Sequence, residues 1–210
     1  MSEERRGGGA EPAEGHTNGP RPRAKRRPSR PGEILEAAVA LFNERGYQST
    51  NMADIGAAIG ITGPGIYRHF PSKQAILETA LTDAGERLMA RVQAIVTAGD
   101  PPPRTLERLV DNYLDGVLEA PALSVLVLED QGVLRDEIRQ WGADHLRVHM
   151  RAWVDALSAA RPELTRLECR ARVIGAFSMA YAMPPLRLLM PREQVAASLR
   201  AMCAAILWAR

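Results

Sequence analysis

Residues 61–73 of the chain read Ile-Thr-Gly-Pro-Gly-Ile-Tyr-Arg-His-Phe-Pro-Ser-Lys. Thr62 is placed to cap a short helix, and the proline that follows costs little there because the first amide protons of a helix have no partner within it. Pro71 closes the helix, and Ser72 is placed to cap the next one. We therefore expect a short helix from about Gly63 to His69.

A second short helix is expected just before this stretch, from about Asn51 to Ile59. Thr50 is placed as its N-cap, and Gly60 provides the turn between the two helices. This spacing is typical of a helix-turn-helix, in which the second helix can lie in the major groove of DNA. An ordinary helical hairpin has the same spacing, so the spacing alone leaves both open. The residues expected to pack the two helices together are Ile55, Ile59, Ile61 and Ile66.

The rest of the chain also follows the helical period. From Gly32, apolar residues recur along one face until Gly46 ends a first helix, and Ser72 opens a long helix that reaches about Ala98. No segment shows convincing strand alternation, which predicts an all-α protein of about nine helices. After the proline-rich break at 99–103, we expect helices at about 104–119, 122–130, 134–160, 163–183 and 191–209.

Positive charge is concentrated near the N-terminus, although the whole chain carries a net charge of only +2. Residues 21–75 hold nine basic and four acidic side chains. Residues 1–30 are rich in Gly, Pro, Arg and Glu and cannot bury enough surface to offset chain entropy, so we expect a disordered arm. Its basic end, with Arg26, Arg27 and Arg30, could enter the minor groove, follow phosphates or remain a solvated tail.

The stretch 61–73 closely resembles the recognition-helix signature of the TetR family of transcriptional regulators. The resemblance covers about residues 32–80, and Gly56 is a departure, because the family usually has alanine there. Glycine weakens a helix by about 1 kcal/mol relative to alanine. The upstream residues that match the family's first two helices are Ala38, Leu41, Phe42, Gly46, Tyr47, Thr50, Asp54 and Ile55.

The resemblance implies a division of the chain into three parts. These are the arm at 1–30, a three-helix DNA-binding domain at 31–77, and a larger ligand-sensing and dimerisation domain at 78–210. The implied function is a sequence-specific regulator, usually a repressor, that a small lipophilic inducer releases from double-stranded operator DNA. Alternatives are an activating or ligand-independent regulator, or a small-molecule enzyme on a helical fold. An enzyme is not expected, and neither is a cofactor.

The resemblance also implies DNA contacts. Thr50, Tyr67 and His69 would donate to backbone phosphates, and Lys73 would add a charged contact. Arg68 is a further candidate. The residues placed where base edges are met are Thr62, Gly63, Pro64 and Gly65.

Two further sets of residues are expected in the C-terminal domain. In the resembling family this region encloses an inducer pocket, although each side chain could equally be plain core; the candidates are Leu126, Trp141, Met150, Trp153, Phe177, Met179 and Met183. The last two helices are apolar nearly all round, which indicates either a homodimer interface or a central hairpin within the monomer. The interface candidates are Phe177, Tyr181, Leu199, Met202 and Ile206.

Other chemistry has weaker support. His145 and His149 have a spacing that can hold a metal, but no HExxH motif or nearby cysteine accompanies them, so surface or pocket-lining histidines are the simpler interpretation. Cys169 and Cys203 do not suggest a disulfide framework. The sequence shows no signal peptide and no run long enough to span a membrane, so we expect a cytoplasmic protein without a membrane partner.

Overall fold

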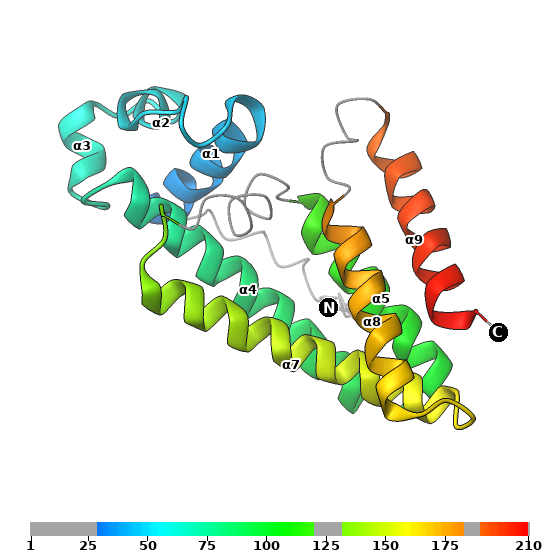
Figure 1. Cartoon of the computed structure of the whole chain (residues 1–210). Helices are drawn as coiled ribbons and strands as arrows, with labels where there is room; N and C mark the ends of the chain where they lie inside the picture. Colours follow the sequence, from blue (N-terminus) through cyan, green and yellow to red (C-terminus); the bar gives the residue numbers. More distant parts are fainter. Residues whose placement is uncertain (1–28, 120–131, 183–189, 210) are drawn as a thin grey trace, which may run out of the picture.

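A computed structural model describes residues 29–119, 132–182 and 190–209, without the side chains of Tyr181 and Ala182. Every regular element in these ranges is an α-helix, which confirms the predicted all-α fold (Figure 1). The expected helix at 122–130 lies outside the described residues, as do Arg26, Arg27, Leu126 and Met183. The helices are α1 (Arg30–Arg45), α2 (Met52–Ala58), α3 (Gly63–Tyr67), α4 (Lys73–Thr97), α5 (Pro102–Glu119), α7 (Asp136–Ala160), α8 (Arg166–Ala182) and α9 (Arg192–Trp208).

The N-cap of α2 is Asn51, so the expectation that Thr50 caps this helix is wrong. The Asn51 side chain accepts a hydrogen bond from the Asp54 amide at 2.9 Å, and the Asp54 carboxylate accepts one from the Asn51 amide at 3.1 Å. This reciprocal pair satisfies two amides that the helix leaves unpaired. Thr50, one residue too early to form it, is buried, and its hydroxyl donates to the Gly46 carbonyl at 2.9 Å.

Glycine permits the tight turn between α2 and α3. A Cβ atom at Gly56 would lie 2.9 Å from the carbonyl oxygen of Ile61, too close for any side chain without a backbone shift. The Ile61 amide donates to the Gly56 carbonyl at 2.9 Å across the same gap. Gly60 has a φ of +69°, a conformation that glycine adopts without strain. Glycine at position 56 weakens α2, but it lets the backbone of Ile61 approach closely enough to form this hydrogen bond.

Buried side chains form two clusters, joined by the long helices α4 and α7. The first cluster combines α1–α3 with the start of α4 as far as Ala80, and it includes Leu134, just before α7. We call α1–α3 and the start of α4 the helix-turn-helix unit. The second cluster begins at Val92 and is built from α5, α8, α9 and the far ends of α4 and α7. Figure 1 shows α4 and α7 running together from the helix-turn-helix unit to the C-terminal helices.

A salt bridge anchors the start of α7 to α4. The Glu78 side chain is only 5% exposed, and its carboxylate accepts from Arg135 Nε at 2.7 Å and from the Arg135 amide at 3.1 Å. Gln74 donates to the same carboxylate at 3.1 Å. Burial alone raises the pKa of Glu78, but the hydrogen bonds from Arg135 and Gln74 outweigh it, so the net pKa is lowered. Glu78 is therefore held ionised although it is buried.

Farther along the same helix pair, Trp141 packs on Gly85. A Cβ atom at Gly85 would clash with the indole ring, so the absence of a side chain on α4 makes room for Trp141 of α7. The ring also stacks on His145, with centroids 3.9 Å apart. Trp141 thus lies in the α4–α7 contact and not among the other aromatic candidates for the ligand pocket.

Replacing Arg135 should destabilise the protein through Glu78. In Arg135→Ala the buried carboxylate loses the guanidinium and keeps only the main-chain amide of residue 135 and the Gln74 side chain. We expect the melting temperature at pH 7 to fall by about 2–8 °C. The pKa of Glu78 should rise, so that protonation relieves the unpaired charge and the deficit shrinks as the pH falls toward 5. Differential scanning calorimetry from pH 7 to pH 5 measures both effects.

The matched control is Arg147→Ala, because Arg147 pairs with Asp144 on the same helix and both side chains are mostly exposed. Its melting temperature should change by less than about 2 °C, since exposed ion pairs contribute little. An Arg135 variant as stable as this control at every pH would contradict the anchoring role of the salt bridge.

Candidate functional site

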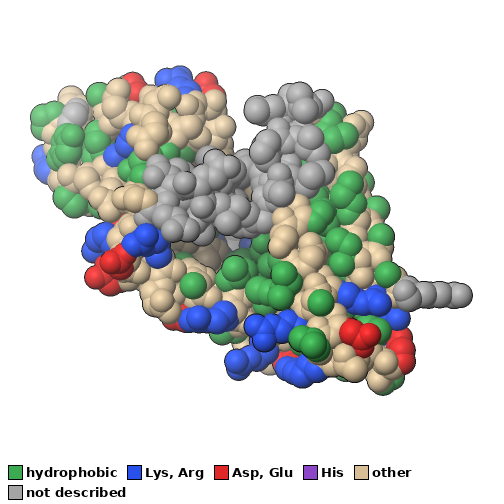
Figure 2. All heavy atoms as spheres, in the orientation of Figure 1, with side chains coloured by type: hydrophobic (Ala, Val, Ile, Leu, Met, Phe, Trp, Pro, Cys, Tyr) green, Lys and Arg blue, Asp and Glu red, His purple; other side chains and the backbone are tan. Residues whose placement is uncertain are grey.

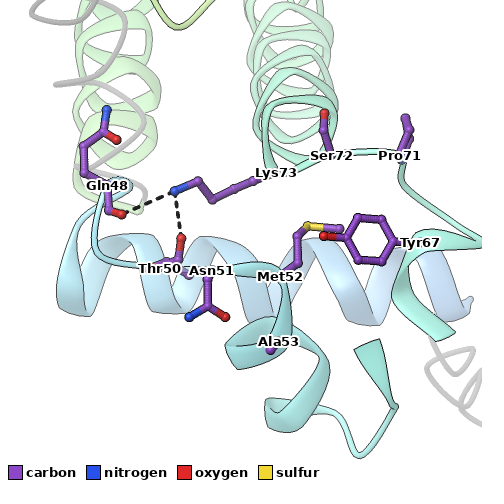
Figure 3. Close-up of a pocket in the computed structure, with 9 residues that line it drawn as sticks. All are labelled: Gln48, Thr50, Asn51, Met52, Ala53, Tyr67, Pro71, Ser72 and Lys73. Atoms are coloured by element: carbon purple, nitrogen blue, oxygen red, sulfur yellow. Dashed lines mark hydrogen bonds between the residues drawn. The ribbon is translucent and has the colours of Figure 1, made fainter. Parts of the chain in front are cut away.

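A shallow concavity lies where α2, α3 and α4 meet (Figure 3). Its volume is about 560 Å³, and the starts of α2 and α4 both border it. The N-terminal ends of these helices place positive partial charge there, which favours anions. The lining residues are Gln48, Thr50, Asn51, Met52, Ala53, Tyr67, Pro71, Ser72 and Lys73.

Lys73 is the only charged side chain that lines the concavity, and its donors are engaged within the protein. Its ammonium donates to the carbonyl oxygens of Tyr47 at 2.7 Å, Thr50 at 2.7 Å and Gln48 at 3.4 Å. It also lies 4.2 Å from the centroid of the Tyr47 ring. Burial lowers its pKa. The ammonium therefore holds the 47–50 turn against α4. This structural role differs from the phosphate contact expected from the sequence.

The outer face of α3 and its flanks is exposed. Tyr67 is 55% exposed at the rim of the concavity, and Arg68 and His69 follow it on the surface. Thr62 and Pro64 are exposed at the helix start. Thr62 is the N-cap of α3, as expected from the sequence, although its side chain makes no capping hydrogen bond.

Two candidates from the N-terminal part lie differently from their expected places. Gly65 is buried, because the side chains of Thr62, Ile61 and Arg68 lie close to it, with the Thr62 hydroxyl oxygen 3.4 Å from where its Cβ would be. The first helix was expected to begin at Gly32, but α1 begins two residues earlier, at Arg30. Arg30 is therefore a helical residue and not the last residue of a disordered arm. Its guanidinium pairs with Glu33 at 2.7 Å on the surface.

Sequence reasoning did not include Gln48, Asn51 and Ser72 among the site residues. Asn51 carried a signal, because an asparagine followed three residues later by an acidic side chain is a pattern of helix capping boxes. Ser72 was predicted as the cap of α4, and its hydroxyl accepts from the Ala75 amide at 3.1 Å. Its place beside the concavity follows only from the packing of α4 and α2 on α1, which the sequence does not reveal.

The second candidate site is a cluster of four rings in the C-terminal domain, formed by Tyr113, His149, Trp153 and Phe177. We call it the aromatic cluster. Trp153 and Phe177 have ring centroids 4.5 Å apart, and Tyr113 lies 4.3 Å from Phe177. All four side chains are buried. Of the expected pocket residues, Trp153 and Phe177 thus come together, and Met150 and Met179 are partly buried against the same core.

The two histidines of α7 lie in different surroundings. His145 makes a 2.8 Å hydrogen bond with the Trp141 carbonyl, whereas His149 is buried in the aromatic cluster. Burial lowers the pKa of His149 to about 4, so its ring is neutral at pH 7. Among the described residues, no three His, Cys, Asp or Glu side chains converge as metal ligands would.

The apolar surface of α8 and α9 differs from the expected dimer interface. Phe177 and Leu199 are buried in the monomer's own core, so their assignment to an interface is wrong: the inner stripes of these helices face α5 and α7. Ile206 is partly buried against that core, and Met202 is 40% exposed. Leu167 and Ile174 on α8 are exposed instead, at 76% and 43%. Figure 2 shows hydrophobic side chains on the surface over these two helices.

The cysteines lie in the same pair of helices, and both are buried as free thiols. Burial raises the pKa of Cys203 to about 11, which leaves little reactive thiolate at neutral pH. None of the described helices is long and apolar enough to cross a membrane.

Comparison with known proteins places this architecture in a family. Residues 34–80 match the model of bacterial regulatory proteins of the tetR family. The chain is 30% identical over 131 residues to the transcriptional repressor KstR2 of Mycobacterium tuberculosis, covering 62% of this chain and 66% of that protein. It is 30% identical over 185 residues to the transcriptional activator FasR of Mycolicibacterium smegmatis, covering 87% of this chain and 80% of that protein. The matches to KstR2 proteins span 48–66% of their length, less than two thirds.

Solved structures show the same fold. The structure of KstR2 of M. tuberculosis, described as a ketosteroid transcriptional regulator, superposes with a TM-score of 0.69 at 23% identity, covering 86% of this chain and 94% of that one. The structure of AibR in complex with isovaleryl coenzyme A and operator DNA gives 0.65 at 19% identity, covering 83% and 97%. The match of residues 34–80 to the tetR family model and the 30% identity to FasR over 80% of that protein show that the chain belongs to the TetR family of transcriptional regulators.

Proposed function

We propose that the chain is a homodimeric regulator that binds a palindromic operator through α3 and leaves it when a small, mostly apolar ligand enters the C-terminal domain. The observation that carries the DNA-binding part is the exposed outer face of α3 beside the concavity at the starts of α2 and α4. A recognition helix presents its N-terminal residues to base edges in the major groove. Thr62, Pro64 and Arg68 are the exposed residues available for that contact.

Neutral donors should make the phosphate contacts at the concavity. Lys73 is engaged with backbone carbonyls, which leaves the Tyr67 hydroxyl, the side chain of Asn51 and the first-turn amides of α4 as donors. Helix N-termini bind phosphate through such amides and the helix dipole. The Lys73 ammonium keeps its charge because its partners are neutral carbonyls, and Arg68 and the basic arm would add to the long-range attraction.

The ligand part of the proposal has separate support. The aromatic cluster occupies the middle of the C-terminal core, where pockets lined by aromatic and apolar groups can hold small molecules. Isovaleryl coenzyme A is bound to AibR, which shares the fold. The FasR match supports a second candidate, an activator with the same DNA-binding part. A reporter under the operator, with and without the gene for this chain, separates them: a repressor lowers expression and an activator raises it.

Removing the Tyr67 hydroxyl should weaken DNA binding without changing its sequence preference. Tyr67→Phe deletes one phosphate hydrogen bond per subunit, and we expect about tenfold weaker binding to operator and to random DNA alike. Thr62→Ala should instead change the preference at one base position per half-site. Fluorescence anisotropy and selection from genomic fragments measure both, and an absence of sequence-dependent binding by the wild type at low salt would overturn the proposal.

The salt dependence of binding tests the arm. If Arg26 and Arg27 contact DNA, the double variant Arg26→Ala/Arg27→Ala should lower the slope of log K against log salt by up to about 4 per dimer. Replacing Arg147, which pairs with Asp144 on α7, should leave the slope unchanged. An unchanged slope in the double variant would identify the arm as a solvated tail.

Charge on the exposed face of α8 and α9 should prevent dimerisation. Ile174→Glu and Met202→Glu would each bury a carboxylate in the apolar interface twice per dimer, and we expect monomers with at least about tenfold weaker operator binding. Val96→Glu is the control, because Val96 is 49% exposed at the far end of α4. Multi-angle light scattering measures the mass, and wild-type protein that is monomeric at micromolar concentration contradicts the proposed assembly.

A further inference from the structure

Two buried polar atoms in the aromatic cluster have no hydrogen-bond partner within the described part of the chain. They are Nε2 of His149 and Nε1 of Trp153, on side chains that are 1% and 0% exposed. Buried polar groups in native proteins are nearly always paired, and leaving one unpaired is costly. Leucine in place of His149, for example, would fill a similar space without that cost. Packing alone therefore does not explain these two side chains.

The two atoms belong to neighbouring positions on one helix face. His149 and Trp153 are four residues apart on α7, so their side chains lie one above the other, and their ring centroids are 6.1 Å apart. Tyr113 from α5 and Phe177 from α8 contact both rings. The unpaired atoms thus lie within one apolar enclosure built by three helices.

In the tautomer of His149 that carries its proton on Nε2, the two atoms suit one kind of partner. An indole N–H can only donate a hydrogen bond, and a neutral imidazole can donate from Nε2. The low pKa of His149 keeps its ring uncharged, and no member of the aromatic cluster carries a formal charge that would balance an ionic group. Two neutral donors one helical turn apart fit an uncharged acceptor with two lone pairs.

We propose that His149 and Trp153 together recognise the carbonyl oxygen of an uncharged, otherwise apolar ligand, such as a ketone, ester or thioester. The inference rests on the proposed sensor function and names the class of ligand that the sensor takes. Met150 and Met179 are partly buried against the same core, and their unbranched side chains can move to admit the apolar part of the ligand.

The test compares probes that differ only at the acceptor. The full-length protein is titrated with the series of straight-chain methyl ketones from 2-hexanone to 2-dodecanone, and with the matching 2-methyl-1-alkenes, in which a methylene replaces the oxygen. We expect at least one ketone to bind about tenfold or more tightly than its alkene. In ¹⁵N-labelled protein, that ketone should move the indole N–H proton signal of Trp153 downfield; Trp153→Phe assigns this signal among the three tryptophans.

Substitutions in the aromatic cluster show which side chains produce the preference for ketone over alkene. Trp153→Phe and His149→Leu should each reduce the ketone-to-alkene affinity ratio by about tenfold, whereas Trp141→Phe, outside the aromatic cluster, should keep it. His149→Leu should melt at or above the wild-type temperature, because it removes an unpaired polar atom and keeps a similar volume. Trp153→Phe also loses part of the buried indole and should melt lower. Strong destabilisation by His149→Leu would show that its Nε2 already has a partner, which overturns the proposal.

The binding measurements can also overturn the proposed recognition of a carbonyl group. The proposal is overturned if no ketone binds, if alkenes bind equally well, or if alkanoates or alkyltrimethylammonium ions of the same length bind more tightly. Operator binding by the unliganded wild type is measured separately. Its absence would overturn the proposed regulatory function while leaving the probe measurements valid for the carbonyl site.

Discussion

Glu78 is buried at the edge of the helix-turn-helix unit, where an unpaired carboxylate would be expensive, and its partner comes from 57 residues further along the chain. Arg135 supplies both its guanidinium and its amide, so the orientation of the residue that opens α7 is fixed as well as its distance. Leu134 adds an apolar contact to the same cluster. The start of α7 thus packs on the helix-turn-helix unit, and the far end of that helix belongs to the C-terminal core.

This arrangement gives the sensor two rigid connections to the DNA-binding unit. From Arg135 to Trp153, α7 spans about 27 Å at 1.5 Å per residue, and α4 runs beside it. Between the two helices, the indole of Trp141 fills the space beside Gly85 and joins them by direct contact. A displacement of α7 near the aromatic cluster should therefore move α4 with it, and in the proposed dimer the position of α4 would set the separation of the two recognition helices.

Local sequence signals predicted the local features well and failed where distant segments meet. Ser72 could be identified as the cap of α4 because capping depends on neighbouring residues. Lys73 was read as a phosphate contact because its carbonyl partners become visible only after the 47–50 turn folds onto α4. Phe177 and Leu199 were assigned to an interface because hydrophobicity all round a helix does not say which stripe faces the monomer's own core. The Glu78–Arg135 pair has no local pattern at all.

A switch of this kind needs a ligand that binds one conformation better than the other. Allosteric coupling free energies are typically about 1–3 kcal/mol, and pairing two buried donors contributes about the same amount at 0.5–1.5 kcal/mol each. Apolar contacts of a ligand depend weakly on small helix displacements, whereas hydrogen bonds weaken steeply once their geometry is lost. His149 and Trp153 lie on α7, so the conformation that aligns both donors with one oxygen also fixes the helix that Arg135 anchors to the DNA-binding unit. The polar pair, more than the apolar enclosure, should therefore decide which conformation a ligand selects.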